Sequence, residues 1–405
     1  MALEATATGG LPDGAARAEA VAVRLRRLGV PLRSGEPVLL RGRTLLAWCR
    51  ERGRSSVAIA RADPSLIPEL QVGAFHRAGV AARAARRVLR RLPTGALATA
   101  LALGGTGRLR RVLADAAFWG GVRADCRDDE WLRLTRAYTV LLYHRLAGEM
   151  KPGQERLDLP PEQFDAHMRL LGRLRCRRLS LAGAIAFHAD PAAILPRRAC
   201  LVTADDAFAD CAAALTRHGG RRPALFVPTG AVGGVAGWAD GERVAGWPAL
   251  CRLRDAGGEL GAHSRSHADL PQLADAALER EVVGALEDLA AAVPAAPCTF
   301  AYPHGRHDLR VRDAVRRAGA RLAFTTDVGA NGAGTDPWCL RRIGVKAHDS
   351  LPAFAWKALT GEPLPGRWER RRLRRARAGG PRSSPQGRGA APDPQPAAPP
   401  SRPRA

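Results

Sequence analysis

In the second half of the chain, short continuous apolar runs alternate with longer segments of helical periodicity. The first run, 139–144 (TVLLYH), is apolar almost throughout, as in a strand buried on both faces of a parallel sheet. A helix is expected at 161–175, with apolar residues three and four apart. Further strands are expected at 200–206, 223–229, 259–263, 298–303 and 321–326, with helices ending near His218 and covering 247–256, 274–292 and 308–318. This alternation predicts right-handed βαβ units around a parallel sheet, closed or nearly closed into an α/β barrel.

The chain before residue 138 follows a different pattern. Residues 1–18 are small and polar and are expected to be flexible, whereas 19–135 predicts arginine-rich amphipathic helices, for example at 81–92 and 109–117. These helices contribute no residue to the clusters of candidate catalytic or metal-binding side chains. We therefore expect a shortened chain spanning about 136–362 to fold without them. From Gly379 to Ala405 the sequence is rich in Pro, Gly and Ser, which predicts a disordered and dispensable tail.

One stretch of the helical region, 60–75 (ARADPSLIPELQVGAF), faintly resembles the helical tail of bacterial family-two glycosyltransferases. No sugar-nucleotide DxD motif accompanies it, so transferase activity does not follow. We interpret this stretch as a helical packing or docking segment. A glycosyltransferase of the same pathway is the partner that this resemblance would allow.

Charge and cysteine content exclude several classes of function. The formal net charge is +24, but only three of the 63 basic residues are lysines and aromatic residues make up 5% of the chain. This composition indicates a bias towards arginine along the whole chain and argues against a nucleic-acid partner. The eight cysteines are scattered without any CxxC spacing, which argues against a zinc-thiolate site. Neither a signal-peptide h-region nor an apolar stretch long enough to span a bilayer is visible. This predicts a cytoplasmic protein without an integral membrane span, with a membrane-proximal location as the alternative.

Three polar clusters each follow a predicted strand, at the edge where α/β barrels place their active sites. The first is the adjacent pair Asp205-Asp206. Two neighbouring carboxylates at a strand end indicate either a bound metal ion or a carboxyl group with a shifted pKa. The second is His263 and His267, whose i, i+4 spacing would place both imidazoles on one face of a helical turn, as in sites that bind a divalent cation. The third is 300–305 (FAYPHG), an aromatic strand that ends in Tyr302, a proline and a glycine turn.

Taken in order, the three clusters resemble the motifs of polysaccharide deacetylases with the NodB homology domain, carbohydrate esterase family four. That family has T-F-D-D-G, then H-S/T-x-x-H, then an aromatic element of the FxYPYG type, to which 203–207, 263–267 and 300–305 correspond here. The resemblance covers about 138–360. It implies a distorted (β/α)7 barrel that follows the helical region. It also implies metal-assisted hydrolysis of an N-acetyl group on a sugar or polysaccharide, in cell-envelope or exopolysaccharide biosynthesis.

Carried over position by position, the resemblance makes Asp206, His263 and His267 the ligands of a divalent metal, zinc before cobalt or nickel. Asp205 becomes the general base. The backbone N–H of Tyr302 becomes a donor to the oxyanion, and Arg342 orients or charge-balances Asp205. The implied partner is an N-acetylated carbohydrate, with no nucleic acid.

The sequence also departs from the family pattern. Ala204 and Ala207 replace the usual Phe and Gly around the Asp pair, and an alanine at positive φ would strain the turn. No late L-x-H element supplies the usual general acid, which leaves His348 and His304 as candidates. His307 joins His304 as an H-x-x-H pair that is a rival for metal. Two alternative functions therefore stay open: a catalytically degenerate carbohydrate-binding relative, and a metal-dependent amidase for a small non-sugar amide.

Overall fold

The computed structural model describes residues 42–102, 107–147 and 158–365, except for the single positions 219, 221, 295 and 297. By its contacts the chain divides into two units, Met1–Pro363 and Leu364–Ala405. The expected flexible N-terminus at 1–18 and the expected tail at 379–405 lie outside the described residues. The domain boundaries derived from the sequence therefore stay predictions.

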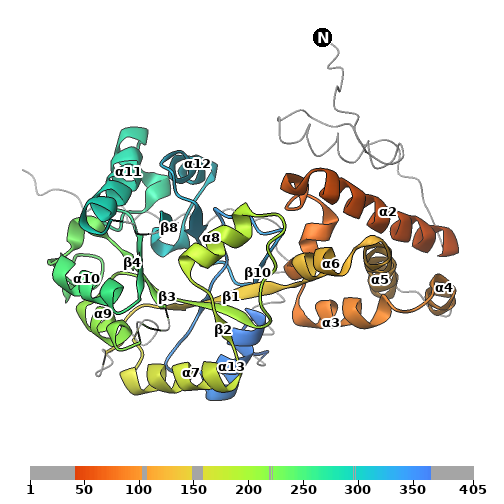
Figure 1. The fold of residues 1–405 in the computed structure, drawn as a ribbon, viewed down its shortest axis with the longest axis horizontal. Coiled ribbons are helices and arrows are strands. Elements are labelled where there is room, and N and C mark those ends of the chain that lie inside the picture. The colour runs from red at the N-terminus through yellow and green to blue at the C-terminus, as the bar shows by residue number, and fades with distance from the viewer. Residues whose placement is uncertain are drawn as a thin grey trace, which may run out of the picture. The chain divides into compact units, whose positions relative to one another are not determined.

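In the described residues from 137 onward, strands and helices alternate (Figure 1). The strands of the main sheet are β1 (Ala137–Tyr143), β2 (Arg177–Arg178), β3 (Ala199–Ala204), β4 (Ala224–Val227), β7 (Glu259–Ala262), β8 (Thr299–Ala301), β9 (Leu322–Phe324), β10 (Asn331–Gly332) and β11 (Ile343–Gly344). The helices are α7 (Pro161–Arg173), α8 (Leu181–Ala189), α9 (Ala209–Thr216), α10 (Trp247–Asp255), α11 (Asp275–Ala292), α12 (Leu309–Arg317) and α13 (Leu351–Thr360). A separate hairpin, β5 (Val235–Ala236) and β6 (Glu242–Arg243), leaves the loop after β4.

The main sheet runs in the order β10-β1-β3-β4-β7-β8-β9, with β2 paired to β3 and β11 paired to β1. Every pairing is parallel except that of β10 with β1. Since β1, β3, β4, β7, β8 and β9 point the same way, their carboxyl ends meet at one edge. The three polar clusters all follow strands at this edge.

The sheet curls around its own apolar interior. Along β4, Phe226 belongs to the interior cluster, whereas Leu225 packs in the cluster that contains the surrounding helices. The rings of Phe226 and Phe324 lie 5.1 Å apart, although β7 and β8 separate their strands. After β9, Leu340 pairs with β9 and Ile343 pairs with β1. The segment 340–344 therefore spans the distance from the last parallel strand to the first.

The expected fold class is confirmed: a curled α/β barrel sheet follows a helical N-terminal region. Each strand expected from an apolar run is present: β1 is one residue longer than expected, and the other five are shorter by one to three residues. The helices α8 and α13 and the strands β2, β5, β6, β10 and β11 were not expected from the sequence. Helix α8 (LAGAIAFHA) has few polar residues to give it an amphipathic pattern, and strands of two residues are too short to show an alternation.

The described part of the helical region contains α2 (Gly42–Ala62), α3 (Val80–Leu89), α4 (Thr94–Ala102), α5 (Gly107–Asp125) and α6 (Asp128–Thr135). Helix α2 ends where Pro64 begins a short 3-10 turn, which is capped by the Asp63 carboxylate. The region has its own core around the fully buried Trp119, whose ring contacts Phe75 at 4.9 Å and Trp131 at 6.3 Å. The helices expected at 81–92 and 109–117 correspond to α3 and α5, the latter extended on both sides.

This helical core meets the barrel backbone to backbone. Gly73, in the 3-10 segment Gln71–Arg77, lies against Gly334, just after β10. A Cβ at Gly334 would lie 2.1 Å from the Gly73 carbonyl oxygen, so no side chain fits there. Nearby, the buried Arg83 of α3 pairs with Glu362 at 3.1 Å. Two contacts from the C-terminal part of the barrel sequence thus hold the helical region.

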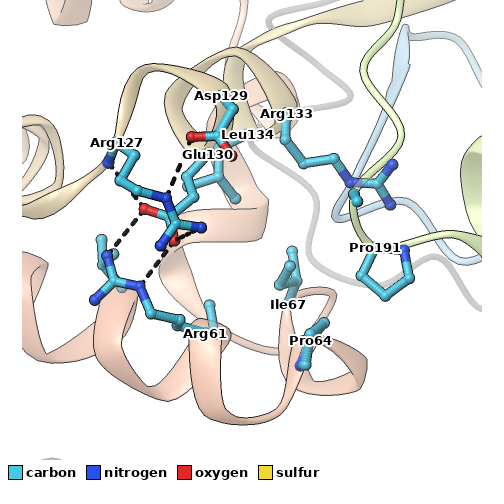
Figure 2. A pocket seen from close by; sticks show the side chains of 12 residues that line it. Arg61, Pro64, Ile67, Arg127, Asp129, Glu130, Arg133, Leu134 and Pro191 are labelled. Carbon is cyan, nitrogen blue, oxygen red and sulfur yellow. Dashed lines mark hydrogen bonds and ion pairs between the residues drawn. The ribbon is translucent and has the colours of Figure 1, made fainter.

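A pocket of about 230 Å³ lies between α2, α6 and the loop after α8 (Figure 2). At its rim Glu130 accepts from Arg61 at 2.8 Å and from Arg127 at 3.0 Å. Arg133 lines the same pocket and donates to the carbonyl oxygen of Phe187 at 2.8 Å. These charges are engaged in structural contacts, and none of the residues singled out for catalysis lines the pocket.

Among the described residues, no helix combines the length and the apolar character needed to cross a bilayer.

Candidate active site

The two adjacent carboxylates after β3 contact different partners. Asp205 donates its backbone N–H to the carbonyl of Tyr143 at 3.1 Å, whereas Asp206 turns the chain with a φ of 70°. Both Asp205 oxygens accept from the Arg342 guanidinium at 2.7 Å, and Arg342 Nε donates to the carbonyl of Thr325 at 2.8 Å. Burial alone would raise the pKa of Asp205, but the charge and hydrogen bonds of Arg342, together with the nearby histidines, hold the pKa below its ordinary value. Asp205 is therefore an oriented, ionised carboxylate.

The two histidines lie on a loop, not on the helical turn that their spacing led us to expect. Residues 263–267 follow β7 without helical structure, and both Ser264 and His267 have positive φ, 59° and 61°. Ser264 Oγ accepts from the His267 N–H at 2.9 Å, and the Glu281 carboxylate accepts from the N–H groups of Arg265 and Ser266 at 2.9 Å. Two left-handed residues, not a helix, bring the two rings within 4.9 Å.

Asp206, His263 and His267 converge in a buried cluster. One ligand atom from each lies within 4.8 Å of the others, and in the described part of the chain this is the one such group of three. His263 Nε2 is 3.6 Å and His267 Nε2 is 3.1 Å from Asp206 Oδ1. Burial would raise the pKa of Asp206, but the neighbouring histidines hold it well below its ordinary value.

The chemistry of this donor set fits a cation. His263 Nδ1 lies 2.7 Å from the carbonyl of Ala301, which can only accept, so Nδ1 carries the proton and Nε2 presents a lone pair. Burial lowers the pKa of His263 to about 4, which leaves the ring neutral at pH 7. Asp206 Oδ1 is buried and has no hydrogen bond of good geometry. His263 Nε2 and the Asp206 carboxylate thus direct lone pairs at each other, and a divalent metal between them satisfies such an arrangement.

Ala207 completes the turn in a strained conformation. Its φ is 49°, in the left-handed region that favours glycine, and its side chain is fully buried. Its carbonyl accepts from the N–H of Ala245 at 2.8 Å, which ties the turn to the segment after β6. The alanine that replaces the family's glycine at position 207 therefore strains the backbone, and its effect is more than a narrower pocket.

Tyr302 does not offer the free backbone donor expected from the sequence. Its N–H donates to the carbonyl of Phe324 at 3.0 Å, in continuation of the β8–β9 ladder. Its hydroxyl donates to the carbonyl of Trp338 at 3.0 Å, and its ring is stacked on His307. The N–H is thus already bound within the sheet, and the role of Tyr302 as an oxyanion donor stays a prediction that this contact does not favour.

The rival histidine pair does not form a site. The exposed His304 lies edge-on to His267 at 4.6 Å, whereas His307 stacks on Tyr302 and lies 3.5 Å from Cys339 Sγ. The two rings therefore have different neighbours.

A further histidine beside the carboxylates was not singled out as a site residue from the sequence. His144 directly follows β1, is half-buried, and its positive form lowers the pKa of both Asp205 and Asp206. The rule that identified the other clusters, a polar residue at the end of an apolar strand, applies to it as well. The sequence-based candidate His348 is exposed on the loop before α13.

Trp238 was also missed. It lies in the turn between β5 and β6, and its ring is stacked on His267 with centroids 4.6 Å apart and planes at 15°. Beside it an open groove of about 670 Å³ is lined by Trp238, Val235, Arg265, Arg280 and Glu281, among others. Nothing in the sequence pattern distinguishes this tryptophan from the others.

Comparison with known proteins agrees with the motifs. The family model described as Polysaccharide deacetylase matches residues 233–323, which include both histidines and Tyr302. Residues 233–323 are thus similar to the polysaccharide deacetylase family. The resemblance stated from the motifs is thereby confirmed over these residues, which hold the second and third motifs. A search of curated proteins gave no match.

Solved structures of deacetylases are similar to about half of the chain. The Streptococcus pyogenes deacetylase PplD, in complex with acetate, is 19% identical over 56% of this chain and 99% of its own, with a TM-score of 0.49. A polysaccharide deacetylase from Bacillus cereus is 20% identical over 55% of this chain and 69% of its own, with a TM-score of 0.47. IcaB from Ammonifex degensii is 20% identical over 55% and 95%, with a TM-score of 0.46.

Proposed function

We propose that the deacetylase domain removes N-acetyl groups from a carbohydrate with the help of one divalent metal ion, zinc before cobalt or nickel. The observation that carries this proposal is the convergence of Asp206, His263 and His267 next to the Asp205–Arg342 pair. All five side chains are buried at the edge where the parallel strands end. Three protein ligands leave positions open, as in catalytic metal sites.

Asp206, His263 and His267 are the residues that would hold the metal. When bound, such a cation supplies a Lewis acid for the acetyl carbonyl oxygen and lowers the pKa of water. His263 keeps Nε2 available for it, because the hydrogen bond from Nδ1 to Ala301 fixes the tautomer.

The chain's own residues then move the protons. Asp205 accepts a proton from the water that attacks the acetyl carbon, and Arg342 holds the carboxylate ionised and in one orientation. His144, beside both carboxylates, donates a proton to the sugar nitrogen as the carbon–nitrogen bond breaks. The products are acetate and a free amine. His144 replaces His348 in this proposal because His348 is exposed on another loop.

The groove beside Trp238 supports an extended substrate. Its volume of about 670 Å³ is of the size that holds a ligand larger than one small group, and it opens next to His267. We therefore favour an N-acetylated polysaccharide or oligosaccharide over a small non-sugar amide. The retained set of Asp205, Asp206 and both histidines favours an enzyme over a degenerate binding protein.

Acetate release from a panel of N-acetylated glycans, with zinc, cobalt or nickel added, tests the activity. The Asp pair tests the mechanism. Asp206→Asn removes a ligand and is expected to lower both metal content and turnover. Asp205→Asn is expected to keep its metal and to lose on the order of 10²–10⁴-fold in rate, as for loss of a positioned base.

His144→Ala, with metal content measured alongside, is expected to behave like Asp205→Asn. If Asp205→Asn loses its metal and Asp206→Asn keeps it, the two roles are reversed. If both Asn variants keep full activity, the proposed mechanism is wrong.

A further inference from the structure

The two histidines of the cluster are held in different ways. His263 is fixed by the hydrogen bond from Nδ1 to Ala301, as most metal-binding histidines are fixed by their second nitrogen. His267 Nδ1 is buried and has no hydrogen-bond partner in the described part of the chain. The His267 ring instead lies flat on Trp238, with centroids 4.6 Å apart and planes at 15°. Its orientation thus depends on ring contacts.

The hairpin that carries Trp238 is anchored on the turn that follows Asp206, as well as on the 263–267 loop through the N–H groups of Thr229 and Gly230. The β5–β6 hairpin continues into Val244, which bridges to Phe208, and into Ala245, which donates to the carbonyl of Ala207 at 2.8 Å. Both anchors belong to the segment that directly follows Asp206. The indole is therefore tied to the turn that supplies one proposed ligand while it supports the ring of another.

We propose that Trp238 is a positioning residue for His267. Its indole face holds the imidazole in the plane that directs Nε2 towards Asp206, in place of the missing hydrogen bond at Nδ1. Offset and parallel aromatic contacts of this kind are attractive and directional. The proposal rests on the proposed metal site, and it assigns Trp238 no contact with the reacting atoms.

Zinc affinity of the full chain tests it, measured by competition with a chromophoric chelator. Trp238→Leu keeps apolar volume but has no flat face, so zinc affinity is expected to fall by roughly 10-fold or more, as for loss of other groups that orient a metal ligand. Trp238→Phe keeps a face and is expected to stay within about 3-fold of the natural chain. The visible absorption spectrum of the cobalt-loaded protein should change in the Leu variant and not in the Phe variant.

Trp338→Leu is the matched control, because Trp338 is also partly buried but donates its indole N–H to Ala320 and does not stack on His267. It is expected to lower thermal stability without changing zinc affinity. The proposal is overturned if Trp238→Leu binds zinc as the natural chain does, or if Trp238→Phe loses as much affinity as a Leu variant. If Trp238→Leu does not fold, the Phe variant decides alone: a loss of 10-fold or more overturns the proposal. If the natural chain binds no zinc, cobalt or nickel, the proposed metal site fails, which is a distinct result.

Discussion

Replacement of Arg342 should lower the free energy of unfolding, because it leaves the charged Asp205 carboxylate buried without a counter-charge. Arg342 is 1% exposed and Asp205 is 3% exposed, and two bonds of 2.7 Å join them. Arg342→Gln leaves the carboxylate without its counter-charge, and breaking a buried ion pair from one side costs about 3–5 kcal/mol. Since typical domains are stable by about 5–15 kcal/mol, this change should remove a large part of the stability. Urea denaturation at pH 7 with a chelator present, followed by circular dichroism, measures the loss.

The double variant Arg342→Gln/Asp205→Asn separates charge from packing. Once Asp205 is replaced by the neutral asparagine, loss of the guanidinium should lower the free energy of unfolding by less than it does in the single variant. We expect a coupling energy of at least about 2 kcal/mol between the two changes. Arg312→Gln is the control: its pair with Asp336 is about one-third exposed, so it should cost less than about 1 kcal/mol. The reasoning would be refuted if the double variant lost, to within about 0.5 kcal/mol, the sum of the stability losses of the two single variants.

Two further outcomes follow from backbone strain and from a buried base. Ala207→Gly should change the free energy of unfolding by less than about 1 kcal/mol, because relief of the left-handed strain offsets the lost methyl. Ala207→Val should cost about 2–4 kcal/mol by urea denaturation, from strain and overpacking together, and a tolerated valine would contradict the conformation described. Burial lowers the pKa of His76 to about 3, so between about pH 6.5 and pH 3 the unfolded chain binds a proton that the folded chain excludes. The free energy of unfolding should therefore fall as pH drops through this window, and His76→Gln should show a shallower fall; equal slopes would count against the burial argument.

Much of the barrel and the identity of its polar clusters could be predicted because they depend on regular features. Buried parallel strands appear in the sequence as apolar runs. Their carboxyl ends lie at one edge of the sheet, which places Asp206 and His263 there independently of the loop conformations. The conformation of the loops could not be predicted in this way. His267 reaches the cluster through left-handed residues that are not glycines, so neither helical spacing nor residue type indicates the path.

Other features depend on contacts between distant segments. Trp238 stands on a hairpin of two-residue strands, and the segment 340–344 closes the sheet only because Leu340 and Ile343 find partners on different strands. Such pairings leave no local pattern. The separability of residues 136–362 likewise stays a prediction, since Arg83 and Gly73 of the helical region contact that part of the chain.

The contact of Gly73 with Gly334 limits how the two parts of the chain can diverge or be exchanged. At most interfaces a larger side chain on one side can be accommodated by a smaller one opposite. Here both sides are already glycine, and a Cβ on Gly334 would overlap the backbone of Gly73. No second substitution can compensate for the first, because no atom is left to remove. A helical region taken from another protein could approach this barrel as closely only while position 334 stays glycine.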